Sequence, residues 1–197
     1  NGMYDALNKG FARGIGDVMG YVNADDALEP GGLWKIGEAF RNDRKLDVIY
    51  HEDVISTNGW RTPNVRQPEG VHMFDLAFGR HILFQDGVWW RRRCYDAVGG
   101  IDGSFKLAGD YDLWLRMSTM FRFTRGEGHV SCFRKRPGQL SESADAYWEE
   151  VERSKKQVRG ALGTRRILRA LPRYALTRVA RLGQRLRRQR FFYPLNP

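Results

Sequence analysis

Two adjacent carboxylates, Asp25 and Asp26, follow a short apolar segment at residues 18–22. Four to eight apolar residues bounded by turn-forming residues predict a buried strand, and open α/β sheets bind ligands at the carboxyl ends of their strands. Carboxylates are hard oxygen ligands, so this position predicts a site for a metal ion and a nucleotide diphosphate. An alternative is that Asp26 and Glu29 form a capping box, with Pro30 in the first turn of the next helix. Capping needs only one carboxylate, which leaves Asp25 unexplained.

A third carboxylate, Asp110, stands at the start of a predicted helix whose apolar face begins at Leu113. Asp110 is placed to cap this helix, and capping would hold its carboxylate rigidly at the edge of a cleft. A carboxylate fixed in this way is a candidate general base. Asp112 and Arg116, in the same helix, have the spacing of an ordinary i,i+4 ion pair.

Aromatic and basic residues at three other places could contact a sugar or a phosphate. Trp89 and Trp90 precede three arginines, which predicts either a strand with a solvated edge or a surface that stacks a sugar and holds phosphate. Core packing is the alternative role for at least one of the two indoles. Arg134 and Lys135 follow a predicted strand and could clamp a diphosphate, or they could form a solvated basic turn. Lys9 has the same two interpretations.

Helices and strands alternate in the part of the chain that must position these residues. Helices are predicted at 3–13, 30–42, 73–79, 94–98 and from 143 to 160, and strands at 18–22, 46–50 and 121–134. Asn58-Gly59 predicts a hairpin turn, and residues 61–70 predict a loop. The alternation favours a parallel or mixed sheet with helices on its faces.

The composition is that of a folded protein. Hydrophobic residues make up 42% of the 197 residues and aromatic residues 13%, which excludes a disordered chain. No apolar run approaches the roughly 20 residues that cross a bilayer, and the N-terminus lacks the pattern of a signal peptide. Cys94 and Cys132 belong to neither a metal-ligand nor a disulfide pattern, so we expect buried thiols in a reducing compartment.

Most of the positive charge lies in the C-terminal part of the chain. Residues 153–190 hold fourteen Lys or Arg and no Asp or Glu, so the overall net charge of +10 leaves −4 for the remainder. We therefore predict a mildly acidic globular domain at 1–152 and a basic tail at 153–197. The tail predicts a helix, kinked or interrupted at Pro172, with one apolar stripe: Leu168, Leu171, Ala175, Val179, Leu182 and Leu186.

The order of the motifs resembles the family 2 glycosyltransferases, which have the nucleotide-diphospho-sugar transferase (GT-A) fold. The resemblance covers residues 1–150. It rests on these segments: Gly2-Met3-Tyr4-Asp5-Ala6-Leu7-Asn8-Lys9-Gly10, Gly16-Asp17, Asn23-Ala24-Asp25-Asp26, Gly99-Gly100-Ile101-Asp102 and Gly109-Asp110-Tyr111-Asp112-Leu113-Trp114-Leu115-Arg116. The implied fold is an α/β mixed sheet flanked by helices, with its first βαβ part missing before Asn1 and a basic helical tail after the catalytic domain.

The resemblance implies roles for the acidic residues. Asp26 matches the final acid of the family's DxD-type motif, which binds a divalent cation, Mg²⁺ or Mn²⁺, that bridges the donor diphosphate. Asp25 is the acid that lies near the donor ribose. Asp110 matches the acid of the family's Glu-Asp motif, the base, and Asp112 in the same motif is assigned to acceptor binding. Gly109 replaces the Glu of that motif, which leaves the role of this position open.

The remaining candidate residues fall on the donor and acceptor sides of the implied site. Lys9, Arg134 and Lys135 are assigned to the donor, a nucleotide-diphospho-sugar. Trp89 and Trp90 are assigned to a saccharide or lipid-linked acceptor.

The implied reaction transfers a sugar to an acceptor hydroxyl with inversion at the anomeric carbon. A cation neutralises the leaving diphosphate, and a fixed carboxylate removes the acceptor proton during attack. The family's processive Gln-x-x-Arg-Trp signature is missing, which favours transfer of a single sugar. Because nothing before Asn1 is present to form the nucleotide-base pocket, we expect a fragment with an exposed sheet edge and little activity alone.

Two rival interpretations belong to other functional classes. A sugar-nucleotide pyrophosphorylase would need a Gly-rich phosphate loop near its start. A non-enzymatic protein would use the tail, and basic residues around a Leu stripe favour an anionic membrane surface over specific nucleic-acid binding. The Leu stripe could instead pack on the domain. With residues 160–190 on a membrane, we expect a cytoplasmic enzyme that is peripheral on the inner membrane face.

Overall fold

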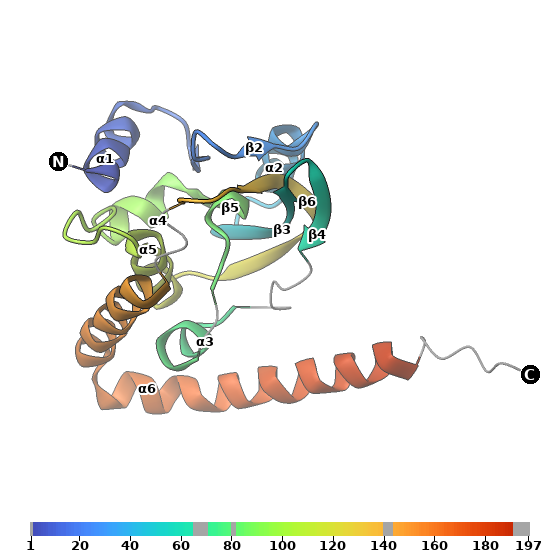
Figure 1. Cartoon of the computed structure of the whole chain (residues 1–197). Helices are drawn as coiled ribbons and strands as arrows, with labels where there is room; N and C mark the ends of the chain where they lie inside the picture. Colours follow the sequence, from blue (N-terminus) through green and yellow to red (C-terminus); the bar gives the residue numbers. More distant parts are fainter. Residues whose placement is uncertain (1, 65–70, 80–81, 140–143, 191–197) are drawn as a thin grey trace, which may run out of the picture. The chain divides into compact units, whose positions relative to one another are not determined.

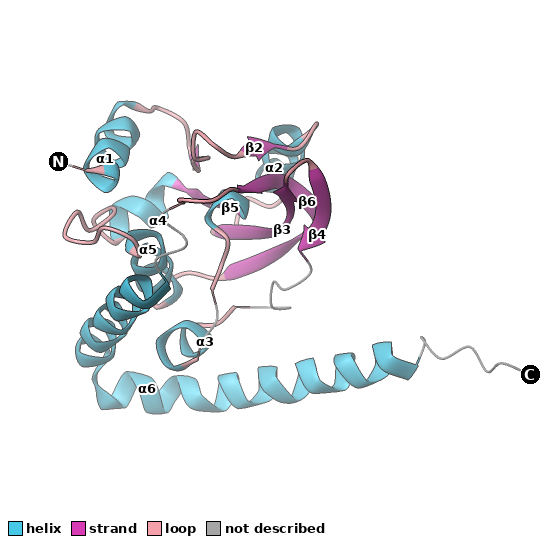
Figure 2. Cartoon of the chain, in the orientation of Figure 1, coloured by secondary structure: helices cyan, strands magenta, loops and turns pink. Residues whose placement is uncertain are grey.

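The computed structural model describes residues 2–64, 71–79, 82–139 and 144–190. The chain divides into two compact units, Asn1–Val158 and Arg159–Pro197. The first unit holds every strand of the described ranges and combines them with helices (Figures 1 and 2). The predicted fold class, a mixed α/β sheet flanked by helices, is therefore confirmed.

The elements follow the predicted order closely. The helices are α1 (Met3–Arg13), α2 (Gly32–Asn42), α3 (Met73–Phe78), α4 (Arg92–Ala97), α5 (Gly109–Ser118) and α6 (Ala144–Arg190), with a short 3₁₀ turn, η1 (Gln85–Gly87). The strands are β1 (Val18–Met19), β2 (Ala27–Leu28), β3 (Val48–Thr57), β4 (Trp60–Asn64), β5 (Val88–Arg91) and β6 (Phe123–Lys135).

One six-stranded sheet forms the centre of the first unit. Its order is β1-β5-β3-β6-β2, and β4 pairs with β3 outside this path. β3 and β6 run parallel, whereas the other pairs are antiparallel. Asn58 and Gly59 both have positive φ and join β3 to β4, as the predicted hairpin turn requires. The predicted loop at 61–70 is wrong for its first part, because Trp60–Asn64 extend this hairpin.

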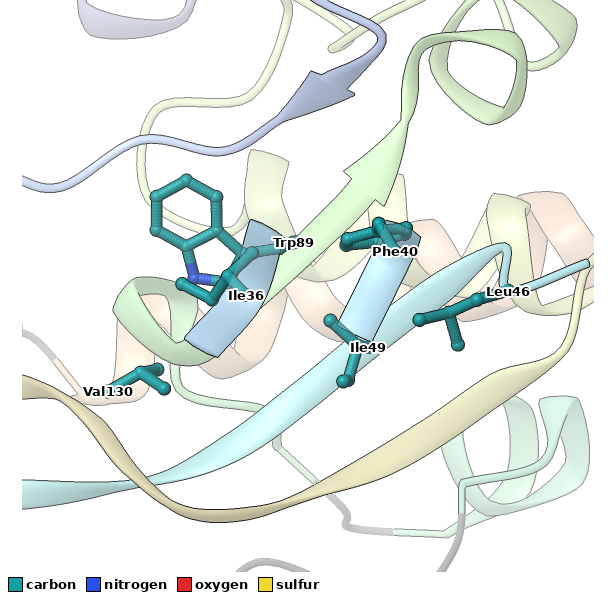
Figure 3. Packing of buried hydrophobic residues seen from close by; sticks show 6 residues of the cluster. All are labelled: Ile36, Phe40, Leu46, Ile49, Trp89 and Val130. Carbon is teal, nitrogen blue, oxygen red and sulfur yellow. The ribbon is translucent and has the colours of Figure 1, made fainter. Parts of the chain in front are cut away.

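Helix α2 covers one face of the sheet. Its Ile36 and Phe40 are buried against Ile49 of β3, Trp89 of β5 and Val130 of β6 (Figure 3). Ile49 and Trp89 are partners in the antiparallel register, so their side chains leave the same face of the sheet. This face is a closed apolar layer.

The neighbouring residue of β5, Trp90, points to the opposite face. Its ring makes an edge contact with Trp114 of α5, with centroids 5.0 Å apart, and lies 6.4 Å from the ring of Tyr95 in α4. Phe11 of α1 adds a third ring at 5.7 Å. Helices α1, α4 and α5 therefore meet around one indole, and Trp114 of this layer lies one helical turn after the candidate base Asp110 in α5.

Two further features, the cysteines and the apolar character of the helices, were considered in the sequence. Cys94 and Cys132 are buried free thiols, as predicted. Within the ranges that the structure describes, no helix combines the length and the apolar character needed to cross a membrane.

The second unit, by itself, is the distal part of α6. The helical backbone breaks at Gly163, whose φ is 64° and ψ is 150°, whereas Pro172 lies inside the helix. The helix is therefore not interrupted at Pro172. The interruption falls at Gly163, because glycine adopts this positive φ without a steric penalty. Leu171 and Ala175 of the predicted stripe are exposed. The side chains of the rest of the stripe lie outside the described residues: Leu168, Val179, Leu182 and Leu186.

Candidate functional site

The acid pair lies in the turn that connects β1 to β2. The backbone N–H of Asp26 donates to the carbonyl of Asn23 at 3.0 Å, which closes this turn. Asp26 does not cap α2, because that helix begins at Gly32 with Gly31 as its N-cap and no side-chain cap. The capping-box alternative is therefore wrong, and Asp26 is available for another role.

The carboxylate of Asp26 is held from two sides. Its Oδ1 accepts the backbone N–H of Arg134 at 2.9 Å, and its Oδ2 accepts Nδ2 of Asn23 at 3.2 Å. Burial raises the pKa of Asp26 despite these bonds, and the neighbouring charge of Asp25 adds to the increase. A carboxylate that is costly to ionise in a partly buried position gains stability from a bound cation.

Asp25 is bound by side chains from the turn that follows β6. Gln139 Nε2 donates to Asp25 Oδ2 at 3.1 Å, and Arg136 donates to the same oxygen from Nη2 at 3.1 Å and from Nε at 3.3 Å. The bonds from Gln139 and then Arg136 lower the pKa of Asp25. Asp25 is therefore ionised at neutral pH and already faces a positive charge.

The turn at residues 134–139 brings the side chain of Arg136 and the backbone N–H of Arg134 to the acid pair. Gly138 has a φ of 79°, and Gln139 closes the turn by accepting the backbone N–H of Arg136 at 3.1 Å and donating to the carbonyl of Arg134 at 2.6 Å. Arg134 contributes its backbone N–H to Asp26, while the residues Arg134 and Lys135 themselves are exposed. Sequence reasoning missed Arg136 and Gln139.

Lys9 is not brought to the acid pair by any contact in the described part of the chain. Its ammonium lies 2.7 Å from Asp5, one turn earlier on the exposed side of α1. The interaction is an ordinary i,i+4 pair at the surface.

Asp110 is the second residue of α5. Its Oδ1 accepts the backbone N–H of Tyr111 at 2.7 Å. Burial raises the pKa of Asp110 to about 6, and the charge of Glu150 adds to the increase. A carboxylate whose pKa lies close to neutral pH is suited to general-base chemistry.

Three tyrosines surround Asp110 closely enough to sense its charge. Burial raises the pKa of Tyr4, Tyr21 and Tyr147, and for each of them the charge of Asp110 is the largest electrostatic contribution. Tyr21 belongs to the segment that leads from β1 to Asp25. The acid-pair segment and the candidate base therefore converge on one region, although 85 residues separate Asp25 from Asp110.

Gly109 has a steric explanation in this structure. A Cβ at this position would lie 2.7–2.8 Å from three ring carbons of Tyr4, closer than side chains tolerate. The hydroxyl of Tyr4 donates to the carbonyl of Leu107 at 2.8 Å, so the ring is held in place against the start of α5. A glutamate here would displace Tyr4, and the replacement of Glu by Gly109 follows from this packing.

The three residues assigned to the acceptor are core residues, and these assignments are corrected. Trp90 is 0% exposed within its aromatic layer, and Trp89 is 8% exposed with its ring against Gly20. Asp112 is 2% exposed, accepting Arg116 Nε at 2.7 Å and Ser154 Oγ at 2.7 Å. Stacking a sugar requires an open ring face, and binding a hydroxyl requires a free carboxylate oxygen, so burial excludes both roles.

The acid pair fits a small hard cation that takes its remaining ligands from a diphosphate. Each oxygen of Asp26 accepts one bond and keeps a second lone pair, and the bonds to Asp25 all end on Oδ2. The described residues contain no group of three or more His, Cys, Asp or Glu side chains that could hold a metal ion. One or two carboxylates are what Mg²⁺ uses when substrate phosphates complete its coordination.

The chain is similar in sequence to proteins that are named for polysaccharide biosynthesis or as glycosyltransferases. The chain is 31% identical over 129 residues to the O-antigen biosynthesis protein RfbC of Myxococcus xanthus, and 31% identical over 101 residues to an uncharacterized glycosyltransferase of Nostoc sp.. It is 26% identical over 115 residues to a PGL/p-HBAD biosynthesis glycosyltransferase of Mycobacterium bovis. These matches cover 64%, 51% and 58% of the chain, but only 10%, 29% and 43% of the respective relatives. No family model matches the chain.

The fold is similar to that of solved structures of TarS from S. aureus. TarS of S. aureus, in the structure of residues 1–349 in complex with UDP-GlcNAc, superposes with a TM-score of 0.57 at 18% identity, over 75% of this chain and 44% of that chain. The UDP complex gives a TM-score of 0.56 at 17% identity over 78% of this chain. The chain shares the TarS fold. It is also similar in sequence to proteins that are named glycosyltransferases.

Proposed function

We propose that the chain is the catalytic part of a family 2 glycosyltransferase with the GT-A fold. It would transfer one sugar from a nucleotide-diphospho-sugar to an acceptor hydroxyl, with inversion. The observation that carries the proposal is that α1 contacts both parts of the site. Its Phe11 packs against Tyr21, which precedes the acid pair, and its Tyr4 packs against Gly109, next to the base candidate Asp110. The named relatives and the TarS fold support the same reaction class.

The proposed division of work follows the environment of each carboxylate. Asp110, with its pKa raised to about 6 by burial, accepts the proton of the acceptor hydroxyl. The acceptor oxygen forms a bond to the anomeric carbon while the bond from that carbon to the diphosphate oxygen breaks. The electron pair leaves with the nucleoside diphosphate. Attack on the side opposite to the leaving group inverts the configuration.

The donor side of the proposed site is built from the acid pair and the turn that follows β6. Asp26 would hold a divalent cation, with Asp25 beside the donor ribose, and such a cation neutralises diphosphate charge when it is bound. The guanidinium of Arg136 lies 3.1 Å from Asp25. When the donor is bound, this guanidinium could instead form a bidentate interaction with phosphate oxygens. Arg134 and Lys135 remain candidates as exposed cations on the same turn.

The test uses the longest natural form of the protein, assayed with a panel of nucleotide sugars. Asp26→Ala and Asp110→Asn should each remove most transfer activity, whereas Asp96→Asn, at an exposed position of α4, serves as a matched control. Near-normal turnover by the Asp26 or Asp110 variant would remove that residue from the mechanism. Activity restored by Mn²⁺ after chelation would support the metal dependence. Because the matched regions cover less than half of each relative, we expect residues 1–197 alone to bind donor weakly.

We also propose that residues 160–190 contact an anionic membrane surface close to a lipid-linked acceptor. The support is the excess of Lys and Arg with no acidic residue in this part of the chain, together with the exposure of Leu171. Sedimentation with anionic liposomes should fall when residues 160–197 are deleted. Unchanged sedimentation would reject the proposal.

A further inference from the structure

Glu150, in α6, binds a row of backbone N–H groups directly before α5. Its Oε2 accepts the N–H of Leu107 and of Ala108, both at 2.8 Å, and that of Lys106 at 3.2 Å. Its Oε1 accepts the N–H of Lys106 at 2.9 Å. Successive N–H groups that converge on one carboxylate form an anion-binding nest. Here the bound anion is a side chain of the protein itself.

This nest leads straight into the candidate base. Ala108 is the N-cap of α5 and Asp110 is the second residue of that helix. No side chain caps α5 at its N-cap, so the expected capping role of Asp110 is wrong. Glu150 provides a carboxylate from a different helix in its place, while Asp110 accepts the N–H of its neighbour Tyr111 through Oδ1.

A second bond fixes α6 to α5 one turn further along both helices. Ser154 Oγ donates to Asp112 Oδ1 at 2.7 Å, and Ser154 and Asp112 are both buried. Glu150 and Ser154 are four residues apart and lie on the same face of α6. Figure 1 shows the first part of α6 beside α5, in agreement with these bonds. The start of α5 is therefore held from the C-terminal side of the chain.

We propose that Glu150 is a positioning residue for Asp110, which fixes the start of α5 so that the Asp110 carboxylate meets the acceptor hydroxyl. This inference rests on the proposed glycosyltransferase function. Glu150 does not touch the reacting atoms. It acts through the backbone of residues 106–108, where a displacement of about 1 Å can cost roughly 100-fold in rate.

The charges around Asp110 allow a test of this proposal by the pH dependence of kcat, which a purely structural role of Glu150 would not change. The groups that face it are Tyr4, Tyr21, Tyr147 and Glu150. Burial would raise the pKa of Glu150, but the three backbone N–H groups lower it below the ordinary value, helped by Arg153. The tyrosines are neutral in the acid range, so Glu150 is the one group of this set that is charged while Asp110 titrates.

The experiment compares three variants of the longest natural protein in a transfer assay across pH. Glu150→Gln can keep the bonds to Leu107 and Ala108 through its amide oxygen but removes the charge, so the acid limb of kcat should move to lower pH. Glu150→Ala removes the bonds as well, and kcat should fall roughly 10- to 100-fold while the donor KM stays within about twofold. Ser154→Ala removes the bond from α6 to Asp112 of α5 but leaves the nest intact. It should have a lower melting temperature with little change in the pH profile.

Three outcomes would overturn the inference. They are an unmoved acid limb in Glu150→Gln, a normal kcat in Glu150→Ala, and a loss of kcat in Ser154→Ala equal to that of Glu150→Ala. Asp110→Asn, assayed in parallel, separates the two levels of the argument. If Asp110→Asn is inactive while Glu150→Ala is normal, only the positioning role fails, whereas a normal Asp110→Asn rejects the proposed function itself.

Discussion

The guanidinium of Arg136 lies 3.1 Å from the carboxylate of Asp25, on a turn that begins 109 residues later in the sequence. The turn also donates a backbone N–H to Asp26, so both acids of the pair are bound by the same segment. In the proposed function, the donor diphosphate would meet a carboxylate pair and a guanidinium that are already held together.

We predict that Arg136→Ala raises the donor KM about tenfold, equivalent to about 1.4 kcal/mol, because a charge-assisted bond to phosphate is lost. Steady-state kinetics with varied donor would measure this change. Arg41→Ala, on the surface of α2, is the control. If Lys135→Ala weakens donor binding more than Arg136→Ala, then the cation chosen from the sequence is the correct one and Arg136 is not.

Gly109→Ala should destabilise the protein by about 1–3 kcal/mol and reduce turnover, because the new methyl group overlaps the ring of Tyr4. The affected backbone carries Asp110, so rate and stability should fall together. Gly103→Ala is a matched control, since a Cβ there meets nothing within 4 Å. Unfolding in urea and a transfer assay would test both effects, and equal stability of the two variants would contradict the steric argument.

Asp110→Asn should be more stable than the natural protein at pH 7, although we expect it to be inactive. Burial raises the pKa of Asp110 to about 6 from an ordinary value of 3.8, so ionisation costs the folded state roughly 2–3 kcal/mol above pH 6. The cost disappears as the pH falls from 6 to below 4, because the carboxyl is then protonated in both states. Urea unfolding at pH 7 and pH 4 would reveal the difference, and a variant that is less stable at pH 7 would reject this account.

His51 should give the opposite pH dependence. Burial lowers the pKa of His51 to about 4 from 6.5. The ring packs directly against Gly126, so there is little space for groups that would stabilise the protonated imidazole. The unfolded chain binds the proton first as the pH falls, so stability declines between pH 6.5 and 4 by at most about 3 kcal/mol.

The contributions of His51 and Asp110 oppose each other between pH 4 and 6, so the natural protein alone cannot reveal either one. A comparison of His51→Gln with the natural protein isolates the histidine. The difference in unfolding free energy should change between pH 7 and pH 4, and a constant difference would show that His51 does not titrate in this range.

The sequence predicted the parts of the fold that depend on local patterns. The bounds of α1 match the prediction, and the Asn58-Gly59 turn was correctly predicted because positive φ at two successive positions selects these residues. The indoles of Trp89 and Trp90 were harder, since alternation places them on opposite faces but does not reveal that helices cover both faces. That information depends on where α2 and α5 pack.

Of the candidate site, the sequence predicted the acidic residues but not the residues that bind them. Asp26 and Asp110 both carried plausible local capping roles, and both roles are wrong because the N-caps of α2 and α5 are Gly31 and Ala108. The choice of Arg136 over its neighbours depends on the Pro137-Gly138 turn, whose direction no periodicity reports. Residues that act through turns and through other helices are therefore the ones that sequence patterns do not identify.

The nest at Glu150 also has a consequence for the order in which the protein is made. Translation delivers both acid motifs first, and the residue that holds the start of α5 follows forty positions after Asp110. A nascent chain that stops before α6 would carry every carboxylate assigned to chemistry and still lack a fixed base. The proposed base would then be held in place only after α6 has been synthesised.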